Sequence, residues 1–225
     1  MYQLASPERV ERLTELGVSD ALFEAAVRYA IAEAKQNSKY DAPAMPGITF
    51  WSRTNRFLAE RLTDPENLGK VWKRTSRDSI LRVIHPDATH AITAISGWGS
   101  VGDPEEQART KNPKGGAMAR LVEENAFHLE SSGQHALVSR DEVRFGRELD
   151  SIPLWIFLYQ YKEGRPIKAE LSRPVEMEGK HITVWHERIP IALPDMDPGL
   201  NISLSAPELD DAPAVDVPVQ RKREE

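Results

Sequence analysis

Apolar residues recur at helical spacing in the first part of the chain. Ser6-Pro7-Glu8 combines an N-cap residue with a first-turn proline, and a short apolar stripe follows it and stops at Gly17. Ser19-Asp20 forms a second helix start, after which the apolar residues from Leu22 to Ala34 fall on one helical face. We therefore expect a short helix, a turn and a longer amphipathic helix.

The next stretch of the chain predicts a third helix, a helical turn and a β-hairpin. A proline-containing connector precedes the helix, and β-branched residues mark the two strands of the hairpin. The expected elements are a connector over 37–47, a helix over 49–62, a helical turn that leads from 64–66 into 70–74, and strands over 80–85 and 89–96 joined by a turn at 86–88.

The second half of the chain predicts one more helix and an antiparallel meander. Glycines, prolines and alternating charges indicate a loop over 97–115. Residues 152–161 carry aromatic and branched side chains on both faces, as a central strand does. The expected elements are a helix over 116–129 and strands over 152–161, 167–172 and 180–191, with turns at 162–165 and 178–179.

Together these elements predict an α+β fold. N-terminal helices, a β-hairpin, a central helix and a C-terminal antiparallel meander would form one mostly antiparallel sheet with the helices on one side. A chain of 225 residues is compatible with one domain plus appendages or with two small domains, and we favour one domain. We expect an N-terminal helical segment and connector over 1–48, an α+β core domain over 49–194, and a poorly ordered, acidic, proline-rich tail over 195–225.

Composition narrows the functional classes. The chain has no cysteine, which excludes disulfides, thiolate nucleophiles and zinc sites built on sulfur. The net charge is −6, yet residues 51–120 hold 12 Lys and Arg against 8 Asp and Glu. We find no signal peptide, and the longest apolar stretch, 152–159, is too short to cross a bilayer. A cytoplasmic protein without a membrane role is therefore expected.

Residues 97–102, GWGSVG, fit the letters of the dinucleotide fingerprint G-x-G-x-x-G. Such a loop needs a strand within a βαβ unit and a helix whose N-terminus meets the pyrophosphate. Here the strand is expected to be the second arm of an antiparallel hairpin, and the acidic stretch Asp103-Pro104-Glu105-Glu106 follows the last glycine. We interpret the motif as a flexible loop that leaves a strand, and we expect no cofactor.

A basic segment precedes the expected central helix. Arg109, Lys111 and Lys114 lead to Gly115 and Gly116, where the helix should begin. Free N–H groups at a helix start, glycines that permit close approach and three cations predict a binding site for phosphate. The spacing is not that of a nucleotide-hydrolysing P-loop. The alternative interpretation is a solvated basic loop in which the glycines serve only as turn residues.

A second basic run is interleaved with Trp51 and Trp72. Cations fix phosphates while an exposed indole can stack on a base, so this combination is typical of nucleic-acid binding, particularly of single strands. The alternative is a charged helix face with buried tryptophans. The residues that would extend the phosphate track are Arg53, Arg56, Lys73 and Arg74.

Candidate catalytic residues surround two turns. His85, Asp87 and His90 flank the predicted hairpin turn and could bind a divalent metal without sulfur. Pro86-Asp87 with Glu178 and Lys180 also spells a loose PD…ExK nuclease pattern, although Glu178 and Lys180 are expected to straddle a turn. We expect no resident metal, and a divalent ion belongs only to the nuclease hypothesis.

Three functional hypotheses follow. The first is a non-enzymatic accessory protein that binds a phosphate-bearing ligand, most plausibly nucleic acid, through the basic middle of the chain, while the acidic tail shields that surface or binds a protein partner. The second is a metal-dependent phosphodiesterase or nuclease that uses Asp87 with His85, His90 or Glu178. The third is a structural or scaffold subunit whose tail is the interaction element.

Overall fold

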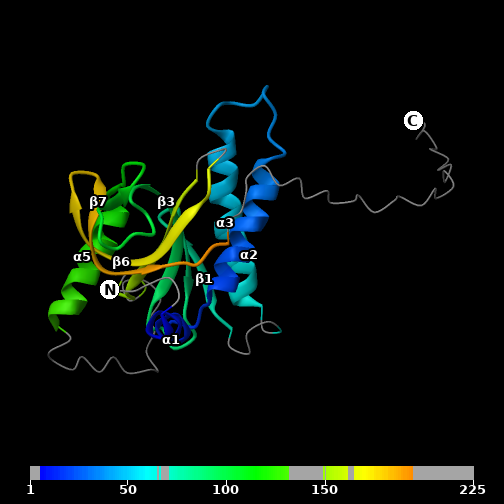
Figure 1. Ribbon diagram of the computed structural model, residues 1–225. Helices are drawn as coiled ribbons and strands as arrows, with labels where there is room; N and C mark the ends of the chain where they lie inside the picture. The colour runs from blue at the N-terminus through cyan, green and yellow to red at the C-terminus, as the bar shows by residue number, and fades with distance from the viewer. Residues whose placement is uncertain are drawn as a thin grey trace, which may run out of the picture.

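The computed structural model describes residues 6–64, 66, 71–131, 149, 151–161 and 165–194. These residues form an α+β fold of four helices and seven strands, which confirms the predicted class (Figure 1). The helices are α1 (Pro7–Glu15), α2 (Asp20–Ala34), α3 (Met45–Thr63) and α5 (Gly116–Ser131). The strands are β1 (Lys73–Arg77), β2 (Ile80–Ile84), β3 (Ala91–Gly99), β4 (Ala108–Thr110), β5 (Leu154–Gln160), β6 (Lys168–Glu178) and β7 (His181–Pro190).

The sheet is mostly antiparallel and runs in the order β1-β2-β3-β5-β6-β7, with β4 paired to β3 outside this path. The predicted hairpin is confirmed as the antiparallel pair β2 and β3, and the predicted C-terminal meander as β5, β6 and β7. Of the described strand pairs, only β3 and β5 run in parallel, with Ala91 opposite Leu154 and Ser96 opposite Tyr159. A parallel pair needs a crossover connection, and α5 lies on the stretch of chain that supplies it.

Helices cover both faces of the sheet, so the expectation of helices on one side was wrong. Trp155 and Phe157 of β5 pack into the cluster formed with α1, α2 and α3, whereas Ile156 and Leu158 pack with α5. Alternate residues of a strand point to opposite faces, which places α5 across the sheet from the other helices (Figure 1). Every residue of β5 before Gln160 is buried, and a strand apolar on both faces requires a cover on each.

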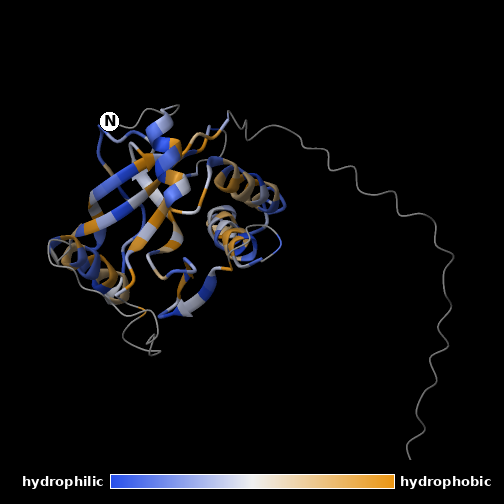
Figure 2. Cartoon of the chain, turned by 90° about the horizontal axis from the view of Figure 1, so that it is seen from below, coloured by the Kyte–Doolittle hydropathy of each residue, from blue (hydrophilic) through white to orange (hydrophobic). Residues whose placement is uncertain are grey.

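The N-terminal helices are fixed to the end of the sheet. Ser6 and Ser19 accept N-cap hydrogen bonds as their sequence positions predict. The buried Arg9 of α1 forms an ion pair of 2.8 Å with Asp20 of α2 and also donates to the Pro190 carbonyl of β7. Figure 2 shows the apolar sides of the helices turned toward the sheet, where one continuous core forms.

Two strands differ from the expected elements. β1 begins at the end of the stretch 70–74, into which a helical turn was expected to lead, and no strand was expected there. It pairs with β2 across a turn whose two residues, Asp78 and Ser79, have φ of 52° and 61°, the conformation of a type I′ hairpin. This turn usually contains Asn-Gly, so Asp-Ser did not signal it. The short strand β4 lies within the segment expected to be a loop.

The boundaries of α3 bear on the expected domain division. The helix begins at Met45 rather than at residue 49, with Pro46 in its first turn, where proline is tolerated. The boundary expected at 48/49 therefore falls inside α3, and α1, α2 and α3 share one core with the sheet. The acidic tail over 195–225 lies outside the described residues.

Candidate functional site

The edge of β3 that faces away from β5 is interrupted. β2 pairs with β3 only at Ala91 and Ile92, and β4 pairs with it only over Gly97–Gly99. Alternate residues direct their N–H and C=O groups to the same edge of a strand. The carbonyl of His90 accepts from the amide of His85, just after β2, and that of Ser96 accepts from the Lys111 amide, both at 2.9 Å. Ala94 therefore faces a gap at this same edge.

A side chain of α3 takes the place of a strand in this gap. Nδ2 of Asn55 donates to the Ala94 carbonyl, and Oδ1 of Asn55 accepts from the Ala94 amide, both at 3.0 Å. The indole Nε1 of Trp51, one helical turn earlier, donates to the same carbonyl at 3.1 Å. The backbone of Ala94 is thus hydrogen-bonded although neither β2 nor β4 reaches it.

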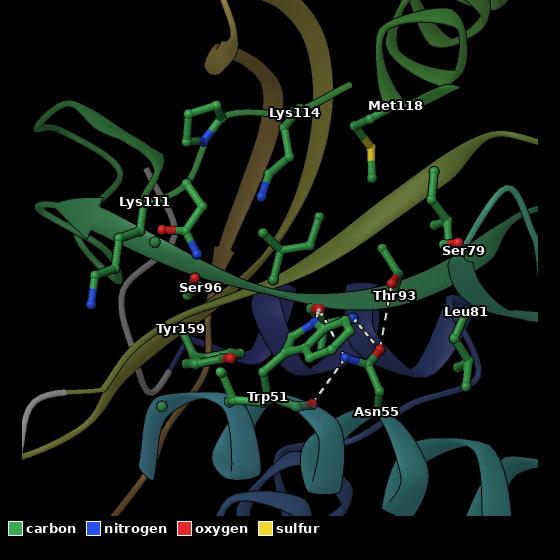
Figure 3. A pocket seen from close by; sticks show the side chains of 18 of the residues that line it. Trp51, Asn55, Ser79, Leu81, Thr93, Ser96, Lys111, Lys114, Met118 and Tyr159 are labelled. Carbon is green, nitrogen blue, oxygen red and sulfur yellow. Dashed lines mark hydrogen bonds between the residues drawn. The ribbon is translucent and has the colours of Figure 1, made fainter. Parts of the chain in front are cut away.

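A cleft of about 760 Å³ opens over the gap (Figure 3). Trp51, Asn55 and Tyr159 lie below β3 in this view, and Lys114 and Met118 lie above it. The cleft therefore spans the edge of β3, from α3 and β5 on one face to the start of α5 on the other. This position, beside the end of a parallel strand and the start of the following helix, is where open α/β sheets bind ligands.

Trp51 presents an aromatic surface to the cleft. Its side chain is 45 % exposed and lines the cavity. Its hydrogen bond to Ala94 fixes the orientation of the ring. A held, exposed indole is suited to stacking on a planar aromatic group.

Lysines make another part of the cleft wall cationic. Lys111 and Lys114 both line it, and their backbone amides bond to the carbonyls of Ser96 and Lys180. Among the described residues, no carboxylate forms an ion pair with either lysine side chain. Partial burial lowers the pKa of Lys114 because the ammonium loses hydration, and none of the described residues supplies a compensating negative charge through an ion pair. An anion in the cleft would supply that charge.

The start of α5 adds hydrogen-bond donors to this wall. Met118 and Ala119 donate the first bonds of the helix to the Gly115 carbonyl, so the amides of Gly116 and Ala117 precede the intrahelical pattern. A Cβ added at Gly115 or Gly116 would meet no atom within 4 Å. The backbone here is thus open to close approach by an anion, as the sequence predicts.

The carboxylate in the lining is already engaged. Asp78, at the turn between β1 and β2, is the one acidic residue among the described residues that line the cleft. It forms an ion pair with Arg120 of α5 at 3.1 Å. Arg120 therefore neutralises the charge of Asp78, and the lysines are the dominant charges among the described residues of the cavity.

Tyr159 carries an unpartnered hydroxyl at the floor of the cleft. The residue is 1 % exposed, and its hydroxyl has no hydrogen-bond partner within the described part of the chain. Burial raises the pKa of this phenol, so the hydroxyl is neutral and can both donate and accept. A buried polar group without a partner costs free energy, and a ligand that enters the cleft could satisfy it.

The structure separates the two basic segments found in the sequence. Arg109, on β4, lies next to the cleft, and Lys111, Lys114 and Gly115 line it. Arg53 instead binds Glu33 at 2.9 Å, and Arg56 binds Glu60 at 2.7 Å. Lys73 and Arg74 lie on the edge strand β1, and none of these four residues lines the cleft.

The candidate catalytic histidines form an aromatic cluster. The rings of His85 and His90 stack with centroids 5.0 Å apart, and the buried Trp72 packs edge-on against both. Nε2 of His90 donates to the Leu16 carbonyl, because a carbonyl can only accept, and Nδ1 of His85 accepts from the Asp87 amide. No group of three or more potential metal ligands occurs among the described residues.

The nuclease-like residues lie near opposite ends of β3. Asp87 sits in the turn before β3, whereas the Lys180 carbonyl bonds to Lys114 beyond Ser96. From His90 to Ser96 the strand rises roughly 20 Å at ~3.3 Å per residue. Glu178 and Lys180 flank the β6–β7 turn, as the sequence predicts. The structure therefore does not bring Asp87 together with Glu178 and Lys180.

The buried histidine predicts acid sensitivity of the fold. Burial, then repulsion from His85, lowers the pKa of His90 to about 4. The unfolded chain takes up this proton near pH 6.5 and the folded chain only near pH 4, so stability falls as the pH drops through that window. We expect a loss of about 2 kcal/mol between pH 7.5 and pH 5. Urea unfolding at both pH values should show a smaller loss in His90→Gln, and equal losses would contradict this origin.

The glycine motif has a packing role. A Cβ at Gly97 would lie 2.7 Å from the Val101 side chain and 2.8 Å from that of Leu158. Gly99 and Gly102 have φ of 87° and 82°, which glycine adopts without strain. β3 does begin a βαβ unit with α5 and β5, contrary to our expectation of a purely antiparallel strand, but α5 starts at Gly116 and not after the motif.

A buried ion pair binds the loop that follows β3. The Gly102 amide donates to Glu170 of β6 at 2.7 Å, and Glu170 forms an ion pair of 2.7 Å with Arg188 of β7. Arg188 also donates to the Ser100 carbonyl at 3.1 Å. Hydrogen bonds at Ser100 and Gly102 thus attach the loop after β3 to β6 and β7.

Asn55 and Tyr159 were not identified from the sequence. Asn55 is a polar residue on the buried, mostly apolar face of α3. Its position one helical turn after Trp51 is the only feature of the sequence that could have indicated its role. Tyr159 lies in the most apolar strand, where a phenol needs a partner that the sequence does not reveal. Both contacts depend on tertiary structure.

No known family model matches the chain. No curated protein and no solved structure matches it either. Within the part of the chain that is described, no helix has the length and apolar character needed to cross a membrane. The functional inference therefore rests on the chemistry of the cleft.

Proposed function

We propose that the protein is a non-enzymatic accessory protein that binds nucleic acid, and that the cleft beside β3 holds one nucleotide unit of the ligand. The phosphate would bind Lys111, Lys114 and the first amides of α5. The base would stack on Trp51 and approach the hydroxyl of Tyr159.

One observation carries this proposal. Lys114, a partly buried lysine that has no counterion among the described residues, lies across a single cleft from an exposed and fixed indole, Trp51. The lysine suits a phosphate and the indole suits a planar base. Together they match a nucleotide better than a free phosphate or a free base. The cavity volume of about 760 Å³ also lies in the range of small-ligand sites.

The proposal of a binding role, not a catalytic one, is supported by how the candidate catalytic groups are used. His85 and His90 pack on each other and on Trp72, and ring nitrogens of both bond to the backbone. General acid–base chemistry needs such groups within reach of a bound substrate. Neither histidine lines the cleft.

The test is the binding of a labelled single-stranded oligonucleotide, followed by fluorescence anisotropy over a range of salt concentrations. We expect Lys111→Ala with Lys114→Ala to weaken binding at least about tenfold and to reduce the salt slope by roughly 1.4, about 0.7 for each lost phosphate contact. Both side chains are exposed or half-buried and form no ion pair with another described residue, so the fold should tolerate their removal.

Lys73→Ala with Arg74→Ala is the matched control. This pair removes the same charge from β1, outside the cleft, and both side chains are exposed. We expect it to weaken binding much less than the cleft pair. Equal effects of the two pairs would indicate general attraction to a basic surface, and the absence of any binding would reject the proposed function.

A further inference from the structure

A second exposed tryptophan lies beyond the cleft on β3. Trp98 is 55 % exposed, and across the β3–β4 pair it is directly opposite Arg109. Directly opposite residues of an antiparallel pair have Cβ atoms about 5 Å apart on the same face. The indole and the guanidinium are thus neighbours at the surface, and among the described residues no carboxylate forms an ion pair with Arg109.

Trp98 faces the same side of the sheet as Trp51. A Cβ at Gly97 would touch Leu158, which packs with α5, so the next residue points to the opposite face. That face holds Ala94, whose side chain joins the cluster of α1, α2 and α3 and whose carbonyl binds Trp51. The two tryptophans therefore lie along one face of β3.

Cations lie between and beside the two indoles. The amide of Lys111 extends the β4 ladder to Ser96, so Lys111 and Arg109 alternate onto the same face of this ribbon. With Trp98 they form a strip, which we call the β3–β4 strip, that is continuous with the lysine wall of the cleft. Aromatic rings interleaved with cations recur where proteins bind unstacked bases and their phosphates.

We propose that the β3–β4 strip, defined by Trp98, Arg109 and Lys111, is a second stacking subsite, and that the ligand is single-stranded nucleic acid whose chain passes from Trp51 to Trp98. This inference rests on the proposed function and specifies its ligand. A duplex keeps its bases stacked in pairs and so cannot use either indole, whereas a free mononucleotide fills the cleft alone.

The geometry sets the length of the site. Ala94, at the level of Trp51, is four residues from Trp98, a separation of roughly 13 Å at ~3.3 Å per residue. Stacked nucleotides rise about 3.4 Å each along one strand, so at most about three fit between the indoles. Beyond Gly99 the exposed acids Asp103, Glu105 and Glu106 end the basic surface and repel further phosphates.

The experiment compares three probes on the full chain: thymidine monophosphate, oligothymidylate of about six nucleotides, and a duplex of the same length. We expect the oligonucleotide to bind at least about tenfold more tightly than the mononucleotide and than the duplex. Trp98→Ala should remove about tenfold of the oligonucleotide affinity and leave the mononucleotide affinity unchanged, and Trp98→Phe should retain most of it.

Phe127→Ala is the matched control, because Phe127 is 62 % exposed on α5 and lies outside the strip and the cleft. It should leave all three affinities unchanged. Mononucleotide binding that depends on Lys114, with an oligonucleotide affinity indifferent to Trp98→Ala, would overturn this inference alone. Equal affinity for the duplex would also overturn it. Failure of every probe to bind would overturn both this inference and the proposed function.

Discussion

Glu170→Ala is expected to lower the free energy of unfolding by about 3–5 kcal/mol. Glu170 is fully buried and accepts hydrogen bonds from Arg188, Ser172 and the Gly102 amide. Its removal leaves the Arg188 guanidinium, whose side chain is 10 % exposed, without its counterion. Breaking a buried pair from one side is costly because the remaining charge cannot regain its hydration. Urea unfolding followed by circular dichroism measures the loss.

Glu60→Ala is the control for this substitution. Glu60 pairs with Arg56 on the exposed face of α3, so the same truncation there should leave stability nearly unchanged. In Glu170→Ala we also expect faster hydrogen exchange at the Gly102 amide, which loses its acceptor. A similar small effect of both truncations would show that the buried pair of Glu170 and Arg188 does not hold the loop after β3 in place.

Asn55→Leu is expected to lower the free energy of unfolding by about 2–3 kcal/mol. Leucine has a similar shape but leaves the Ala94 amide without its acceptor and removes a donor to the Trp51 carbonyl. Asn125→Leu should have an effect of the same size, because its amide bridges the N–H and C=O of Leu154 in the same way. Thermal and urea unfolding of the purified variants provide the measurement.

Asn112→Leu supplies the comparison, since Asn112 is exposed in the loop before α5. We expect little change in its stability. If Asn55→Leu were as stable as Asn112→Leu, the gap between β2 and β4 would not require a side-chain bridge. If Asn55→Leu lost stability and Asn125→Leu did not, the cause would lie in the surroundings of the cleft. It would not lie in the loss of a side-chain amide that bonds to strand backbone.

Local patterns predicted most elements of the fold. The helices α1 and α2 follow from caps and apolar spacing, α5 from apolar spacing, and β5 from a run of apolar residues on both faces. Those signals lie within a few residues of each other, so no tertiary information is needed. The parallel pairing of β3 with β5 and the strand β1 depend on contacts or turn geometry that short patterns do not encode.

The candidate site was predicted only in part. Lys111, Lys114 and the glycines at the start of α5 are contiguous in sequence, so their charge and flexibility were visible together. Arg53 was also counted as a phosphate ligand, but linear charge does not show that Glu33 of α2 binds it. Trp51 and Tyr159 join the lysines only after α3 and β5 meet at β3.

The parallel pair at the centre of the sheet has a consequence for synthesis on the ribosome. When β4 has emerged, α1, α2 and α3 are complete, yet Trp155 and Phe157, on which they pack, have not been made. Pairing of β3 with β5 must also close a long connection, which slows folding. The nascent chain therefore holds an apolar helical layer without its partner, and we expect truncations before residue 154 to associate with chaperones or aggregate.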